Sequence, residues 1–160
     1  MGGRGKDDYD VSAPVDARQA ITDLLFSYAW HFDRNEPELV AALFTDDASL
    51  DYGPEWDPIR GRAAVVPRIS QGLEEIFEAT SHHISNVMIT LESDDEASGR
   101  AYVYAWHRYR DGSPDGHLWA QYHSRFLRTA EGWRISELIL RAAGTQDFHR
   151  ATMHPIGRRD

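Results

Sequence analysis

The spacing of apolar positions changes once along the chain, near residue 80. Over residues 16–35 apolar side chains recur every three or four positions, which is typical of an amphipathic helix. A break containing a proline follows, and the segment PELVAALF (37–44) predicts a short second helix. A third helix is predicted over residues 63–80, although Pro67 and Gly72 lie within it.

The second half of the chain has the features of β-strands. One short strand is predicted earlier, at 48–52, and the others are HHISNVMITLE (82–92), GRAYVYAWHRYR (99–110), HLWAQYHSRFLRT (117–129) and GWRISELILRAAG (132–144). Because short turns join the last four, we expect them to pair as an antiparallel meander. Helices followed by strands predict an α+β fold with the helices on one face of a curved sheet.

The length of 160 residues favours one domain. We expect this domain to span residues 14–148. A Gly-rich, charged segment at 1–13 is predicted to be a flexible N-terminal tail, and residues 149–160 are predicted to be a C-terminal tail.

The strand at 99–110 carries large side chains on both faces. Tyr102, Tyr104 and Trp106 share the face that we expect to point away from the helices. A face exposed to solvent is normally polar. The aromatic character therefore predicts a homodimer or higher homo-oligomer formed through the outer face of the sheet.

Composition narrows the classes of partner. The chain has 17 Lys and Arg against 26 Asp and Glu, a formal charge of −9, which argues against nucleic acid and anionic membranes as partners. No apolar run approaches the ~18 residues of a membrane span. The chain has no cysteine, so it has neither disulfides nor thiolate chemistry, which fits a cytoplasmic protein.

Two adjacent histidines open the strand TSHHISN. Neighbours on a strand point to opposite faces, so only one of His82 and His83 can face a pocket. His82 would share its face with Asn86, a polar set that suits a site, whereas the companions of His83 are mostly apolar. Periodicity alone leaves the choice open.

Asp33 is a second unusual residue, because it ends the first predicted helix, where the helix dipole disfavours an anion. It is either an exposed turn residue or an acid with a buried partner.

No metal-binding motif, phosphate loop, nucleophile elbow or nucleotide fingerprint is present. We therefore expect neither a metal nor a cofactor, the minor alternative being a facial metal site of His82, His107 and Asp33.

Six segments occur in a characteristic order along the chain: ITDLLFSYAWHFD, PELVAALFTDDASLDYG, IRGRAAV, TSHHISNVMI, YVYAWHRYRDG and EGWRISELIL. In this order the chain resembles the SnoaL-like branch of the nuclear-transport-factor-2-like superfamily. This branch includes polyketide cyclases, scytalone dehydratase and hexachlorocyclohexane dehydrochlorinase. The resemblance covers residues 16–148. It implies a cone of curved antiparallel sheet, closed by three N-terminal helices, that encloses a pocket.

The resemblance also implies the roles of individual residues. In the dehydratase and dehydrochlorinase members, an Asp at the end of the first helix pairs with a His that opens the long strand; these positions correspond to Asp33 and His82. The H-x-x-x-N pattern then places Asn86 in the site. His107, in AWHRY, and Tyr52, in LDYG, correspond to a second histidine and a tyrosine of scytalone dehydratase.

This chain departs from scytalone dehydratase at one position, since Phe32 stands where that family has a tyrosine before the dyad Asp. Tyr122 corresponds to an Asn of the family and is a substitute hydrogen-bond donor. The expected substrate-binding residues are therefore Asn86, Tyr122, Phe32 and Trp30.

The expected function is a cofactor-independent lyase of the dehydratase type. His82, oriented by Asp33, would remove a proton next to the carbonyl of a small hydrophobic substrate, aromatic or polyketide-like. His107 and Tyr52 would polarise the carbonyl or the leaving group. Two alternatives remain open: a polyketide cyclase or isomerase with the same base, and a non-catalytic subunit that binds a ligand or a partner.

Overall fold

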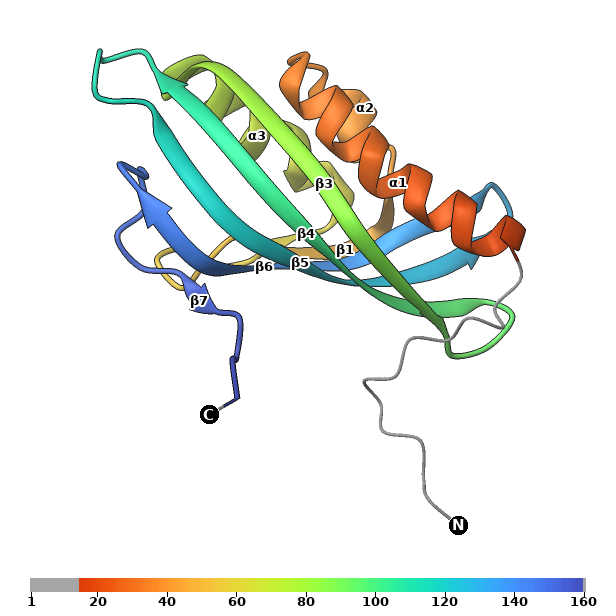
Figure 1. Ribbon diagram of the computed structural model, residues 1–160. Helices are drawn as coiled ribbons and strands as arrows, with labels where there is room; N and C mark the ends of the chain where they lie inside the picture. The colour runs from red at the N-terminus through yellow and green to blue at the C-terminus, as the bar shows by residue number, and fades with distance from the viewer. Residues whose placement is uncertain (1–14, 160) are drawn as a thin grey trace.

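The computed structural model describes residues 15–159, so the predicted tail at 1–13 lies outside the described residues. Helices pack on the inner face of one strongly curved sheet, with α1 running diagonally across β3 (Figure 1). The helical elements are α1 (Val15–Asp33), α2 (Pro37–Ala41), η1 (Arg62–Ala64) and α3 (Val65–Glu75). The strands are β1 (Phe44–Asp51), β2 (Ile59–Arg60), β3 (Phe77–Leu91), β4 (Glu96–Tyr109), β5 (Gly116–Thr129), β6 (Gly132–Gln146) and β7 (His154–Pro155).

The strand order is β2-β1-β6-β5-β4-β3, with β7 paired to β6. The predicted α+β class and the antiparallel meander of β3 to β6 are confirmed. The sheet as a whole is mixed, because β1 and β7 each run parallel to β6, whereas the long strands of the meander are antiparallel. The chain from β2 through α3 to the end of β5 separates β1 from β6, and such a long connection permits a parallel pairing.

The third helix ends earlier than its sequence pattern predicts. It stops at Glu75, and β3 already begins at Phe77. Phe77 pairs with Tyr109, and Thr80 with His107, so pairing with β4 takes these residues into the sheet. This long-range pairing overrides the local helical pattern.

The first helix covers two different regions. Its first half contributes fully buried Ile21 and Leu25 to a core that also contains Phe126 and Ile135 from the sheet. Each buried aliphatic side chain of this kind stabilises the fold by about 1.5–3 kcal/mol. The second half of α1, from Tyr28 onward, covers a cavity instead, and the core holds the helix above it.

A bulge interrupts β3 between Ser85 and Met88, and Asn86 has a φ of 50° there. The extra residue reverses the alternation of the strand, so that Ile89 is buried whereas Met88 is exposed. The prediction that Asn86 shares the pocket face with His82 is therefore wrong. Asn86 is exposed and lies away from the cavity.

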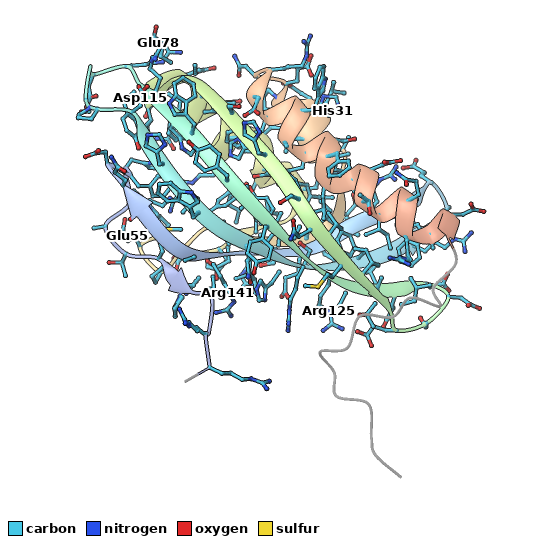
Figure 2. The ribbon with its side chains drawn as sticks, viewed as in Figure 1. His31, Glu55, Glu78, Asp115, Arg125 and Arg141 are labelled. Atoms are coloured by element: carbon cyan, nitrogen blue, oxygen red, sulfur yellow. The ribbon has the colours of Figure 1, made fainter. Side chains whose placement is uncertain are left out.

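The outer face of the sheet carries aromatic side chains over β4 and β5. Tyr102 and Trp119 are 48% and 45% exposed. Arg125 and Arg141 project from the same side, away from the helices (Figure 2). Whether this face joins subunits stays a prediction. Within residues 15–159, no helix has the length and apolar character required to cross a membrane.

Candidate active site

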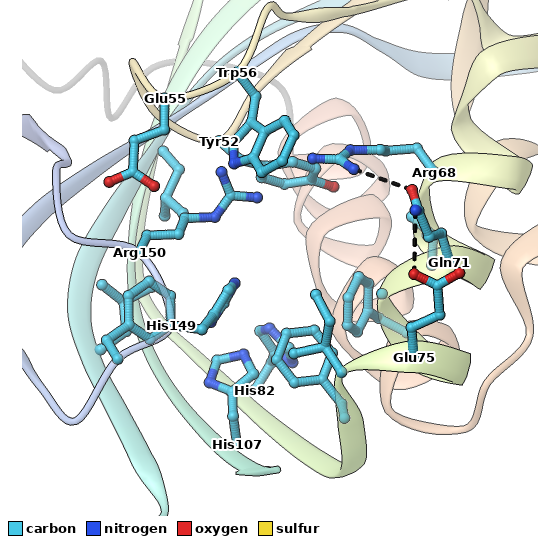
Figure 3. Close-up of a pocket in the computed structure, with 18 of the residues that line it drawn as sticks. Tyr52, Glu55, Trp56, Arg68, Gln71, Glu75, His82, His107, His149 and Arg150 are labelled. Atoms are coloured by element: carbon cyan, nitrogen blue, oxygen red, sulfur yellow. Dashed lines mark hydrogen bonds between the residues drawn. The ribbon is translucent and has the colours of Figure 1, made fainter. Parts of the chain in front are cut away.

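A cavity of about 350 Å³ lies between the second half of α1, α3 and the inner face of the sheet. Its walls are largely apolar. Phe32, Ile69, Ile76, Phe77, Leu118, Leu140 and Phe148 supply them. Polar side chains lie on the inner wall, on the wall next to β1 and at the mouth (Figure 3). An apolar cavity with few polar groups is typical of a site for a small organic molecule.

Asp33 and His82 form a closely bonded pair beside this cavity. The Oδ1 atom of Asp33 lies 2.6 Å from His82 Nδ1, and its Oδ2 accepts the backbone N–H of His82 at 2.7 Å. The hydroxyl of Thr80 donates to Oδ1 at 2.8 Å. The end of α1 and the start of β3 thus supply one rigid unit.

These contacts define the state of both side chains. Burial alone would raise the pKa of Asp33, but the hydrogen bonds from His82 and Thr80 hold it below its ordinary value. An ionised carboxylate accepts a hydrogen bond from Nδ1–H, and in that tautomer Nε2 is the ring nitrogen with a free lone pair. His82 lines the cavity, and together with Asp33 it also borders an outer groove on the other side of the pair.

His107 adds a second imidazole to the inner wall. It is 4% exposed, and its ring centre lies 5.5 Å from that of His82 in an edge-on arrangement. Burial, followed by the nearby His82 and His149, lowers the pKa of His107 to about 3. The ring is therefore neutral near pH 7, and its Nδ1 is buried without a partner among residues 15–159.

Three tyrosines meet on the wall next to β1. The hydroxyls of Tyr28 and Tyr52 are 2.7 Å apart, and the Tyr122 ring packs edge-on against Tyr28 at 5.7 Å. Burial raises the pKa of Tyr52 to about 12 and also raises those of Tyr28 and Tyr122. All three keep their protons and can donate hydrogen bonds.

The sequence did not point to Tyr28 as a site residue, because its position fits the buried stripe of α1. One helical turn before Phe32, it brings a hydroxyl next to Tyr52. The chain therefore has a pair of tyrosine hydroxyls in the site although Phe32 has none. Phe32 itself lines the cavity, with its ring centre 4.9 Å from that of His82.

The prediction that Trp30 lines the pocket is wrong. Its side chain is 63% exposed, and the Arg34 guanidinium lies 5.4 Å from the ring centre. Side chains two positions apart on a helix point to different faces. Phe32 therefore faces the cavity, whereas Trp30 borders the outer groove with Asp33.

The segment after β6 is more than a tail, contrary to the sequence-based prediction. It turns back over the cavity, and His149 and Arg150 line the mouth (Figure 3). Strand β7 then pairs with β6, where His154 Nε2 lies 3.0 Å from both carboxylate oxygens of Asp51. No local motif marks these residues, because the fold alone brings them to the site.

The mouth also contains residues of α3 and of the loop after β1: Arg68, Gln71 and Glu75 on the helix, and Glu55 and Trp56 on the loop. Burial and the charges of Arg150 and Arg68 lower the pKa of His149 to about 4.

The part of the chain that the structure describes has no group of three or more His, Cys, Asp or Glu side chains able to hold a metal ion.

Comparison with known proteins identifies relatives of this chain. A model of the SnoaL-like domain matches residues 13–139. An uncharacterized protein of Mycobacterium tuberculosis is 29% identical over 130 residues, which cover 77% of this chain and 83% of that protein.

Solved structures share the fold. A candidate scytalone dehydratase from Novosphingobium aromaticivorans superposes with a TM-score of 0.83 at 37% identity, over 89% of this chain and 94% of that one. A hexachlorocyclohexane dehydrochlorinase from Novosphingobium barchaimii has a TM-score of 0.76 at 19% identity, over 88% and 96% of the two chains. The likeness to the second protein shows the fold alone.

Proposed function

This chain belongs to the SnoaL-like domain family, and we propose that it is a cofactor-independent lyase of the dehydratase type. Its substrate is a small hydrophobic carbonyl compound, aromatic or polyketide-like. The observation that carries the proposal is the 2.6 Å contact between Asp33 and His82 at the wall of an apolar cavity. The likeness to the candidate scytalone dehydratase at 37% identity supports the same class.

His82 is the general base. Its Nε2 removes a proton from the carbon next to the carbonyl, and the electron pair of that C–H bond moves into an enolate. Asp33 does not touch the substrate; it holds the Nδ1–H tautomer and stabilises the imidazolium that forms. The imidazolium then returns the proton to the departing hydroxyl, which leaves as water while the enolate collapses to the enone.

The developing enolate oxygen needs hydrogen-bond donors within this largely apolar cavity. The Tyr28–Tyr52 pair and Tyr122 fit this role, because burial keeps their hydroxyls protonated. His107 stays uncharged at the inner wall, where its unpartnered Nδ1 can bond to the leaving hydroxyl or to the carbonyl.

The alternative of a non-catalytic subunit predicts a pair out of hydrogen-bond reach or a cone filled by side chains. Neither condition holds, since the pair is 2.6 Å apart and the cavity has a volume of about 350 Å³. These two features favour catalysis.

A panel of aryl β-hydroxy ketones tests the proposal. We expect the wild-type protein to convert at least one of them to a conjugated enone, seen as new ultraviolet absorbance and loss of water in the mass spectrum. The His82→Ala variant, folded by circular dichroism, should be inactive. An unchanged mass with an altered structure would instead indicate a cyclase or isomerase, and equal activity of both proteins would contradict the assignment of the base.

A further inference from the structure

Two guanidinium groups, those of Arg150 and Arg68, face each other at the mouth of the cavity (Figure 3). The Arg150 side chain makes no hydrogen bond or ion pair with any residue in 15–159, and its Nη1 is buried. Arg68 donates to the neutral amide oxygen of Gln71 at 3.3 Å. Among residues 15–159, neither guanidinium therefore has an ion-pair partner.

Aromatic rings hold both groups in place. The Arg150 Cζ lies 5.9 Å from the centre of the Tyr52 ring, and that of Arg68 lies 4.7 Å from the Trp56 ring. Stacking on a ring occupies the face of a guanidinium but leaves its N–H edge free to bind. Burial, and then the charge of Arg68, lowers the pKa of Arg150. Two partly desolvated cations in this arrangement are costly unless an anion binds between them.

The acidic side chains of the mouth have other partners. Glu55 accepts the backbone N–H of Thr152 at 2.6 Å, and Glu75 accepts a hydrogen bond from Gln71 at 3.2 Å. Neither forms an ion pair with Arg68 or Arg150, although the charge of Glu55 partly offsets the lowering of the Arg150 pKa by burial. Both carboxylates would repel a doubly charged anion more than a singly charged one. The mouth is therefore better suited to a carboxylate than to a phosphate dianion.

We propose that Arg150 and Arg68 bind a carboxylate of the substrate, which is a small aryl or alicyclic acid with its apolar body in the cavity. This inference rests on the proposed function, because it takes His82 to act on the inner end of the same molecule. The paired guanidinium edges match the planar, two-oxygen geometry of a carboxylate. The carboxylate fixes the depth and direction of entry, so that the acidic C–H reaches the base.

Binding of naphthoate and of its neutral isostere naphthamide, measured by titration calorimetry, tests this inference without any turnover. We expect the wild-type protein to bind naphthoate about 10-fold to 100-fold more tightly than naphthamide, as charge-assisted hydrogen bonds imply. Arg150→Gln and Arg68→Gln should each remove most of this preference and leave naphthamide binding unchanged. Arg125→Gln, an equal charge change on the outer face of the sheet, should keep the preference.

Several results would overturn the inference: failure of wild-type protein to bind naphthoate, equal affinity for the two compounds, or an equal loss of preference in Arg125→Gln. Tighter binding of naphthyl phosphate than of naphthoate would also reject a carboxylate. The His82→Asn variant should still bind naphthoate. A failed base assignment thus leaves this result intact, and a failed anion site leaves the effect of His82 on deprotonation intact. Thermal denaturation checks that each variant is folded.

Discussion

Asp33 binds His82 through both of its oxygens, one to the ring Nδ1 and the other to the backbone N–H. The second contact fixes the position of the strand relative to the helix, while the first fixes the ring. A carboxylate that holds both backbone and side chain leaves the imidazole little freedom to rotate or change tautomer. Such preorganisation is what a general base in an apolar cavity requires.

Replacing Asp33 with Asn should lower the deprotonation rate by about 100-fold to 10,000-fold, because an amide can also donate to the ring and favour the wrong tautomer. Ring opening of nitrobenzisoxazole measures this directly, since removal of its C–H proton releases a coloured phenoxide. His82→Ala should reduce the rate to that of buffer. His83→Ala, an exposed neighbour on the opposite face, is the matched control and should retain the wild-type rate. Wild-type activity in Asp33→Asn would contradict the role of the pair.

Stability should fall as the pH decreases because of His107. Its pKa is about 3 in the folded protein against 6.5 as an ordinary value, so between these values the unfolded chain binds a proton that the folded chain does not. The stabilisation is complete above pH 6.5 and is lost as the pH falls toward 3. One such group contributes a slope of at most about 1.4 kcal/mol per pH unit.

Urea denaturation across this pH range measures the slope for the wild-type protein and for His107→Asn. The variant should show a smaller loss of unfolding free energy on acidification, and the difference between the two slopes isolates His107 from the other titrating groups. Parallel slopes would mean that His107 is not held neutral by the fold.

The hydroxyl of Tyr52 should matter more for rate than for stability. Tyr52→Phe removes its 2.7 Å contact with Tyr28, which we expect to cost about 1 kcal/mol of unfolding free energy. As a donor to an enolate, the same hydroxyl should lower kcat by about 100-fold when it is removed, with a smaller change in KM. Tyr102→Phe, on the outer face, should change neither quantity. An unaltered kcat for the β-hydroxy ketone in Tyr52→Phe would exclude Tyr52 as a donor.

The exposed aromatic face predicts self-association. Light scattering at micromolar concentration should give at least a dimer, and replacing Trp119 with Glu should produce a monomer, because a carboxylate would be desolvated in the interface. The variant Arg125→Glu changes the charge at another position of β5. It tests whether a negative charge anywhere on this strand is enough to produce a monomer. A wild-type monomer would mean that Tyr102 and Trp119 have another role.

The periodicity of the sequence predicts most of the fold, because each amphipathic segment needs one buried face. It predicts the meander and the first helix well. It does not predict the end of α3, the bulge at Asn86 or the parallel pairing of β1, since each depends on partners far along the chain. The bulge has the largest consequence, because one extra residue moves Asn86 from the expected pocket face to the surface.

The residues of the site also fall into two groups, those that the sequence indicates and those that only the folded chain brings to the cavity. Asp33 and His82 were indicated by a family pattern, whereas spacing alone left His82 and His83 equivalent. Tyr28 carries no signal of its own, since an aromatic on a buried stripe is usually core. Arg150 lies beyond the last long strand, and only the return of the chain over the cavity brings it to the mouth.

The last prediction concerns Tyr109, which holds this returning segment. Its hydroxyl donates to the carbonyl of Asp147 at 3.1 Å and accepts the backbone N–H of His149 at 2.9 Å. Tyr109→Phe removes both bonds, so Arg150 should lose part of its fixed position. We expect naphthoate affinity to fall several-fold and the unfolding free energy to fall by about 1 kcal/mol. Calorimetry and urea denaturation measure the two effects.

Tyr104→Phe is the matched control, because it removes a 2.7 Å hydroxyl contact with His117 on the outer face of the sheet. It should cost a similar amount of stability and leave naphthoate affinity unchanged. If Tyr109→Phe also leaves the affinity unchanged, then the segment that carries Arg150 is held by its other contacts, such as β7 and the Asp51–His154 pair. The ring opening of neutral nitrobenzisoxazole should be equal in both variants, because neither change reaches His82 or Asp33.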